Sequence, residues 1–227
     1  MIFQNNLLKR PLYKVVFCRF MRDLTSMNSH KSEEFVSCQK GDALIIVDVQ
    51  NDFLPPNGSL AVAKGDEVIQ PINKAILEFQ HNHLPIYATR DWHPTDHCSF
   101  KQPDKKEGIW PPHCVAETLG AQFPESLNLP LEAKVISKAT QPNEDAYSGF
   151  QGTELGDLLK ATEIKRVFVA GLATDYCVLN TVKDALGYGF EVVLLLDAVR
   201  AVNVKPEDGA AALEEMKRLG VVCMKSL

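Results

Sequence analysis

The sequence predicts an α/β protein with a doubly wound, six-stranded, mostly parallel sheet and helices on both faces. One observation is the apolar run at residues 43–47, which is continuous rather than alternating and therefore indicates a strand buried on both faces. Another is that such runs alternate along the chain with segments whose apolar residues recur at helical spacing. With 227 residues, the chain is long enough for one sizeable core and short for two domains.

The individual elements follow from these two patterns. Pro71 is compatible with the first helix because it lies near the helix start, and Gly171 is expected to end the fourth strand. Strands are predicted at residues 43–47, 85–89, 134–137, 167–170, 191–197 and 221–224, and helices at 68–79, 154–162, 175–186 and 206–219.

The amino-terminal part differs from the rest. Residues 1–40 show no sustained period and are predicted to form a weakly ordered extension ahead of a domain at residues 41–227. Residues 1–22 are rich in Lys and Arg and contain no acidic residue, a composition typical of an organellar presequence. The alternative is an extended or mis-started amino terminus ahead of Met21 or Met27. We expect a cytoplasmic protein, with an organellar presequence left open.

The composition argues against several classes of function. The formal net charge is -5, so the chain has no basic field for nucleic acid or an anionic membrane. The longest apolar runs are too short to span a membrane. The six cysteines have no repeated spacing, which indicates a reducing compartment rather than a disulfide framework. A small neutral or weakly polar substrate fits this composition better.

Reactive side chains follow the first four predicted strands, namely Asp48, then Asp91 with His93, then Lys138, then Cys177. If the strand order is 3-2-1-4-5-6, these four strand ends are contiguous at the edge where open α/β sheets bind ligands. Cys177 would lie in the first turn of a helix, where unpaired N–H groups favour a thiolate. The alternative is that Cys177 packs against the sheet. Asp52, in the following loop, suits a turn or cap.

A metal site is a second hypothesis. Asp91 and His93 flank Trp92 so that both side chains can point the same way, and His113 follows two prolines. An Asp/His/His set suits Zn²⁺, Fe²⁺ or Mn²⁺ with positions left open for water or substrate. His97 remains open as a fourth ligand, a partner of a ligand or a surface histidine. The alternative is a loop cap at Asp91 and ordinary surface histidines.

Taken together, these segments resemble the nicotinamidases of the isochorismatase-like cysteine hydrolases. The resemblance extends from Asp42 to the carboxyl terminus and departs at no catalytic or metal position. It rests on Lys138 and on five segments in the family's order: Ile45-Ile-Val-Asp-Val-Gln-Asn-Asp-Phe53, Thr89-Arg-Asp-Trp-His-Pro94, Trp110-Pro-Pro-His-Cys114, Tyr147-Ser-Gly-Phe150 and Gly171-Leu-Ala-Thr-Asp-Tyr-Cys-Val178.

The resemblance implies a chemistry as well as a fold. The catalytic residues would be Asp48, Lys138 and Cys177, and the metal ligands Asp91, His93 and His113. It further implies a cis peptide bond between Leu172 and Ala173 and an oxyanion hole formed by the backbone N–H groups of Ala173 and Cys177. The reaction would convert nicotinamide and water to nicotinate and ammonia through a thioester, with one divalent metal ion, zinc before iron or manganese.

Phe53, Trp110 and Tyr147 are candidates for the walls around a flat ring, or plain core residues. A homo-oligomer is left open.

Three rival functions also remain. A metal-free relative of the family would lack the Asp/His/His set. A nucleotide-binding protein would need a Gly-rich loop after the first strand, which is missing. A redox sensor would pair Cys177 with Cys98 or Cys114.

Overall fold

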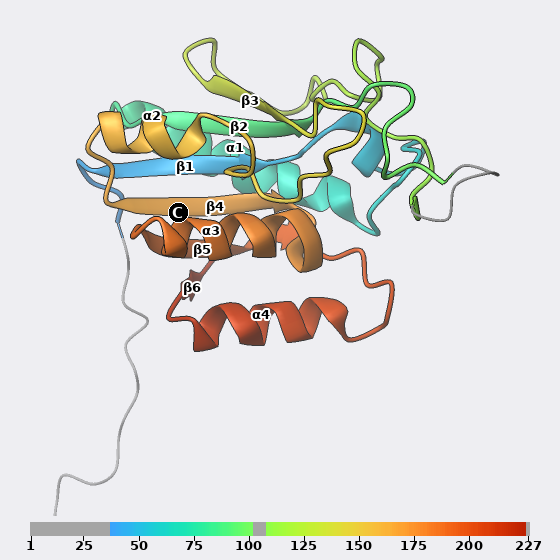
Figure 1. Ribbon diagram of the computed structural model, residues 1–227. Helices are drawn as coiled ribbons and strands as arrows, with labels where there is room; N and C mark the ends of the chain where they lie inside the picture. Colours follow the sequence, from blue (N-terminus) through green and yellow to red (C-terminus); the bar gives the residue numbers. More distant parts are fainter. Residues whose placement is uncertain (1–36, 102–107, 226–227) are drawn as a thin grey trace, which may run out of the picture. The chain divides into compact units, whose positions relative to one another are not determined.

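The computed structural model describes residues 37–101 and 108–225 and contains one six-stranded sheet (Figure 1). The strand order is β3-β2-β1-β4-β5-β6, and every neighbouring pair is parallel. The predicted fold class is therefore confirmed, and the strand order is the one under which the four strand ends are contiguous. The predicted extension at residues 1–40 lies almost entirely outside the described residues. Strands are β1 (Asp42–Val47), β2 (Ile86–Asp91), β3 (Lys134–Lys138), β4 (Arg166–Leu172), β5 (Glu191–Arg200) and β6 (Val222–Met224).

Helices cover both faces of the sheet, with α1 behind it and α2, α3 and α4 in front in Figure 1. The residues of β1 are all buried, as the continuous apolar run predicted. Alternate strand residues pack with α2, α3 and α4 in one core cluster, whereas Phe168 on β4 contacts Phe79 of α1. The helices are α1 (Ile69–His81), α2 (Leu155–Ala161), α3 (Leu179–Gly187) and α4 (Asp208–Arg218), with shorter turns η1 (Asn51–Phe53), η2 (Gly65–Val68) and η3 (Thr174–Val178).

The prediction that Gly171 ends the fourth strand is wrong, because β4 continues to Leu172. Gly171 has a φ of 117°, and a Cβ atom there would lie 2.1 Å from the carbonyl oxygen of Val47 on β1. Glycine is thus needed inside the strand, where it lets two backbones approach closely. The pairing of β4 with β5 shifts register between Val169 and Gly171, and β5 extends to Arg200 beyond this shift.

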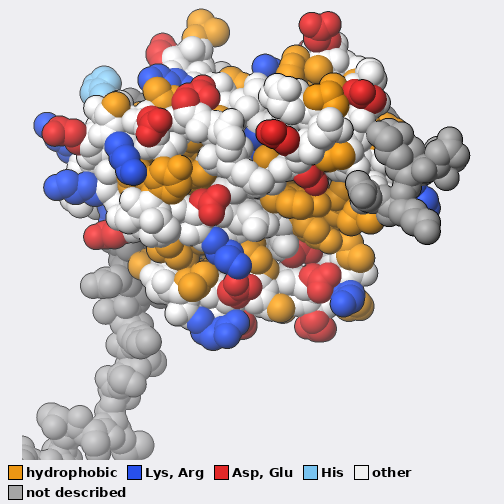
Figure 2. Space-filling view, in the orientation of Figure 1, with side chains coloured by type: hydrophobic (Ala, Val, Ile, Leu, Met, Phe, Trp, Pro, Cys, Tyr) orange, Lys and Arg blue, Asp and Glu red, His pale blue; other side chains and the backbone are white. Residues whose placement is uncertain are grey.

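The charged surface and the lengths of the helices bear on possible partners. Figure 2 shows acidic and basic side chains interspersed over the face that carries α2, α3 and α4. None of the helices within residues 37–101 and 108–225 is long and apolar enough to cross a membrane.

Tyr87 on β2 allows a test of core energetics. Its side chain is fully buried, and its hydroxyl has no hydrogen-bond partner among the described residues. Because a buried unsatisfied polar group is destabilising, Tyr87→Phe should raise the free energy of unfolding by about 1 kcal/mol in urea titrations. Tyr188→Phe, at a position that is 43% exposed, is the control and should change it by less than about 0.5 kcal/mol. A fall in stability of the Tyr87 variant would contradict this reading of the hydroxyl.

Candidate active site

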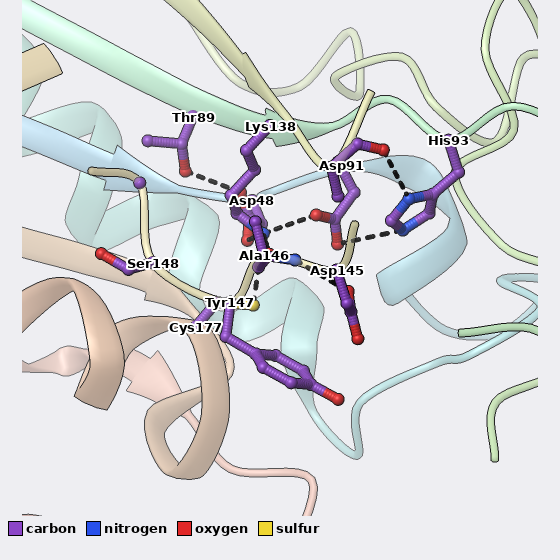
Figure 3. A network of polar contacts seen from close by, with 12 residues as sticks. Asp48, Thr89, Asp91, His93, Lys138, Asp145, Ala146, Tyr147, Ser148 and Cys177 are labelled. Atoms are coloured by element: carbon purple, nitrogen blue, oxygen red, sulfur yellow. Dashed lines mark hydrogen bonds and ion pairs between the residues drawn. The ribbon is translucent and has the colours of Figure 1, made fainter. Parts of the chain in front are cut away.

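The ends of β1, β3 and β4 bring a carboxylate, an ammonium group and a thiol together (Figure 3). Asp48 follows β1, Lys138 is the last residue of β3, and Cys177 lies in η3, just after β4. Lys138 Nζ lies 3.0 Å from Asp48 Oδ2 and 3.6 Å from Cys177 Sγ. The side chains of Asp48 and Lys138 are fully buried, so their interaction is little screened by solvent.

Asp91, at the end of β2, joins this group to a second one. Its Oδ1 accepts a hydrogen bond from Lys138 Nζ at 2.5 Å, and its Oδ2 lies 3.7 Å from His93 Nε2. The buried side-chain amide of Gln50 makes two hydrogen bonds to the backbone of Asp91, each at 2.8 Å. Its oxygen accepts from the Asp91 N–H, and its nitrogen donates to the Asp91 carbonyl oxygen. One carboxylate therefore faces the ammonium group on one side and the histidines on the other.

The charges in this cluster are set by burial and by one another. Burial raises the pKa of Asp48, and the positive charge of Lys138 opposes that shift. Burial alone would lower the pKa of Lys138, but the carboxylates of Asp48 and Asp91 raise it well above its usual value. Lys138 is therefore a cation at neutral pH, and Asp48 has an increased affinity for a proton.

The prediction that the start of a helix favours a thiolate at Cys177 is wrong. Burial raises the pKa of Cys177 well above its ordinary value, and the nearby charge of Lys138 lowers it only in part. The start of the helical segment cannot compensate for the loss of solvation that a buried thiolate suffers. To act as a nucleophile, the thiol would have to lose its proton to a neighbouring base, and Asp48 lies in the same cluster.

Two further residues support the cluster and were missed from the sequence. Thr89 on β2 donates its hydroxyl hydrogen to Asp48 Oδ1 at 2.6 Å, and the carbonyl oxygen of Ala146 accepts from Lys138 Nζ at 2.9 Å. In the β1–β2 register Thr89 lies beside Val47, the residue that precedes Asp48. A threonine within a strand looks ordinary in the sequence, so only a correct register could have identified Thr89.

Asp91, His93 and His113 form a group that can hold a divalent metal ion. All three are buried, and one donor atom from each lies within 4.8 Å of the others. The Nδ1 atoms of the two histidines contact backbone carbonyl oxygens, His93 that of Ala139 at 3.2 Å and His113 that of Pro111 at 2.8 Å. In each histidine this contact makes Nδ1 the protonated nitrogen and leaves Nε2 for a metal. Burial and the neighbouring histidines lower the pKa of His93 to about 3, so its ring is neutral as a ligand must be.

His97 is neither a surface histidine nor a member of this group. It is fully buried and stacks on His93 with 4.1 Å between ring centroids. Both of its ring nitrogens are engaged, Nδ1 with Ser99 Oγ at 2.8 Å and Nε2 with the carbonyl oxygen of Glu144 at 3.1 Å. It therefore supports a histidine of the metal group from behind. His81 and His83 are exposed.

Cys177 and all three residues of the possible metal group line one pocket, and aliphatic and aromatic side chains form most of the rest of its lining. The three predicted aromatic side chains line it, and Trp110 Nε1 donates to the hydroxyl oxygen of Tyr147 at 3.0 Å. Ala173 and Cys177 line it as well, and the Leu172–Ala173 peptide bond is cis, as the resemblance implied. The complete lining is Phe53, Leu60, Val62, Asp91, His93, Ser99, Trp110, His113, Asp145, Ala146, Tyr147, Leu172, Ala173, Tyr176, Cys177 and Val202.

Sequence reasoning did not identify several pocket residues that come from irregular segments. Asp145 lies in the loop before Tyr147, and Val202 follows β5. Asp175, two residues before Cys177, holds the latter loop, since its carboxylate accepts the N–H groups of Val202 at 2.9 Å and Asn203 at 2.8 Å. By contrast, Asp52 is the turn residue expected, accepting from the N–H groups of Ser59 and Cys114.

Comparison with known proteins agrees with this geometry. The nicotinamidase of Escherichia coli is 40% identical over 196 residues, which are 78% of this chain and 92% of that protein. The pyrazinamidase of Pyrococcus horikoshii, solved in complex with zinc, is 49% identical with a TM-score of 0.76, covering 82% of this chain and 99% of that one. An L. infantum protein solved in complex with nicotinate is 40% identical with a TM-score of 0.75, covering 84% and 96%.

The family model for the isochorismatase domain matches residues 42–226, which include every strand and helix of the sheet and all residues of both groups. The chain therefore belongs to the isochorismatase family.

Proposed function

We propose that this protein is a nicotinamidase that hydrolyses the carboxamide of nicotinamide to give nicotinate and ammonia. The observation that carries the proposal is Asp91, whose carboxylate joins the Asp48, Lys138 and Cys177 cluster to a group suited to a metal ion. The nucleophile and the residues that would hold a positioning ion thus line one pocket, and the proton acceptor lies in the cluster behind the nucleophile. Relatives named nicotinamidase, similar over most of their length, support the same activity.

The reaction begins with proton transfer. Asp48 takes the thiol proton of Cys177 as the sulfur attacks the carboxamide carbon, a role favoured by the raised pKa of Asp48. Lys138 keeps the charges of this step tolerable in a buried site. The C–N bond then breaks, and protonated Asp48 gives its proton to the departing ammonia. In the second half Asp48 takes a proton from water, which attacks the thioester, and the sulfur leaves as the thiol when the proton returns.

Two other parts of the pocket would assist. The backbone N–H groups of Ala173 and Cys177 would donate to the carbonyl oxygen as negative charge develops on it, and loss of such a donor typically costs about 3 to 4 kcal/mol. Phe53, Trp110 and Tyr147 would pack on the faces of the pyridine ring, since all three line the pocket. Together these contacts would hold the carboxamide next to the sulfur.

The donor set fits the divalent metal that the family implies. Asp91, His93 and His113 would hold the ion, and two imidazoles with one carboxylate are a donor set that zinc takes. When bound, the metal supplies a Lewis acid that a ring nitrogen of the substrate can coordinate, which positions the ring.

The direct test is ammonia release from nicotinamide by the full chain, before and after chelation. The zinc-loaded protein should release one ammonia per nicotinate formed. Because the metal positions the ring, chelation should lower the rate by about 10²-fold, and added Zn²⁺ should restore it. A zinc-loaded, folded chain that releases no ammonia from nicotinamide would contradict the proposed function.

His93→Ala should weaken both metal and substrate binding. Removing one of three donors should lower the Zn²⁺ affinity by at least about 100-fold, measured by competition with a chromogenic chelator. The KM for nicotinamide should rise more than kcat falls, because the ring loses its anchor. His81→Ala is the matched control, since His81 is an exposed histidine at the end of α1. Unchanged zinc content in the His93 variant would remove His93 from the ligand set.

A further inference from the structure

A second group of possible metal ligands lies beside the first one. Asp48, Asp91 and Cys177 are all buried, and one donor atom from each lies within 4.8 Å of the others. The group includes a thiol, which is a ligand that zinc and other soft ions prefer. It shares Asp91 with the group formed by His93 and His113. Two adjacent groups that share a carboxylate are the arrangement found in two-metal sites.

A positive charge of the protein itself already occupies this second position. Lys138 Nζ contacts all three donors, at 3.0 Å from Asp48, 2.5 Å from Asp91 and 3.6 Å from Cys177 (Figure 3). Its fourth contact is the carbonyl oxygen of Ala146 at 2.9 Å. The ammonium group is fully buried and held from several sides, so solvent and mobile ions cannot easily replace it.

An ammonium group and a metal ion would have different consequences for the thiol. A metal at this position would form a bond to the sulfur, deprotonate it and occupy the electron pair needed for attack. The ammonium group supplies positive charge without forming such a bond. It also repels a second divalent ion, and a metal ion held by the adjacent group would add to that repulsion.

We propose that Lys138 excludes metal ions from the nucleophile, so that a chain with a metal site next to a reactive thiol does not lose that thiol to its own cofactor. Lys138 has this role only if Cys177 is the nucleophile of the proposed function. The test below measures metal content rather than turnover, so metal exclusion can fail while the nicotinamide assay succeeds, and the reverse.

The test is the zinc content of Lys138 variants of the full chain. Each protein is incubated with excess Zn²⁺, freed of unbound ion by gel filtration and subjected to elemental analysis. The parent protein should keep one zinc per chain, and Lys138→Ala should keep two. Lys138→Arg, which retains the positive charge, should keep one. The double variant Lys138→Ala, Cys177→Ala should return to one, because the sulfur ligand of the second site is gone.

Cadmium gives an independent spectroscopic readout. Titration of Lys138→Ala with Cd²⁺ should produce an ultraviolet thiolate-to-cadmium charge-transfer band that the parent protein and the double variant lack. If removal of the buried charge prevents Lys138→Ala from folding, as judged by circular dichroism, the same measurements apply to Lys138→Met, which fills more of the space. One zinc per chain and no cadmium band in the folded, charge-free variant would overturn the proposal.

Discussion

Cys177→Ala is expected to lower kcat/KM for nicotinamide by about 10⁴-fold or more while the fold stays intact. Without the sulfur no thioester can form, and losses of this size are typical when the nucleophile of a cooperating set is removed. The side chain is small and 7% exposed, so the free energy of unfolding should fall by only about 1 to 2 kcal/mol. Ammonia release and urea titration measure the two effects.

A second thiol provides the control for this substitution. Cys223 on β6 is a free, half-buried cysteine outside the pocket, and Cys223→Ala should leave the rate of ammonia release unchanged. Mass spectrometry of the parent protein, quenched with acid during turnover, should find the nicotinoyl adduct on Cys177. Substantial turnover by Cys177→Ala would refute the thioester route. It would not test the assignment of the metal ligands, which the His93 variant tests separately.

The core of this site could be predicted from the sequence because it depends on where strands end. Four residues, Asp48, Asp91, Lys138 and Cys177, lie at or just after the end of a predicted strand, and parallel strands deliver their carboxyl ends to one edge. The strand order 3-2-1-4-5-6 was a condition of this prediction, and the structure has that order. The aromatic pocket walls followed from the same loops.

Other features depend on contacts between distant segments and so were not predictable. Gly171 lies inside β4, where the backbone of Val47 on the neighbouring strand comes too close for a side chain. The support of Asp91 by Gln50 joins two loops through hydrogen bonds that leave no sequence pattern. The acidity of Cys177 was predicted wrongly because the helix start was visible in the sequence, whereas the burial of Cys177 was not.

Asp48→Asn offers the sharpest separation of the roles within the cluster. The amide cannot take or return a proton, so kcat for nicotinamide hydrolysis should fall by about 10²- to 10⁴-fold. Asp48→Asn also removes a negative charge that raises the pKa of Cys177, while Lys138, which lowers it, remains. The thiol pKa should therefore fall, so that more thiolate is present at neutral pH and iodoacetamide alkylates Cys177 faster than in the parent protein.

The two outcomes together distinguish a proton carrier from a simple activator of the thiol. If Asp48 served only to generate the thiolate, alkylation and hydrolysis would slow together. If its essential task is instead to hold the proton that the departing ammonia needs, alkylation, which requires no such proton, accelerates while hydrolysis fails, and this is the result we expect. Asp42→Asn is the matched control at the opposite end of β1, where Asp42 pairs with Arg166 at 2.6 Å. That variant should lose stability but keep both the alkylation rate and kcat, because its charge lies at the other edge of the sheet.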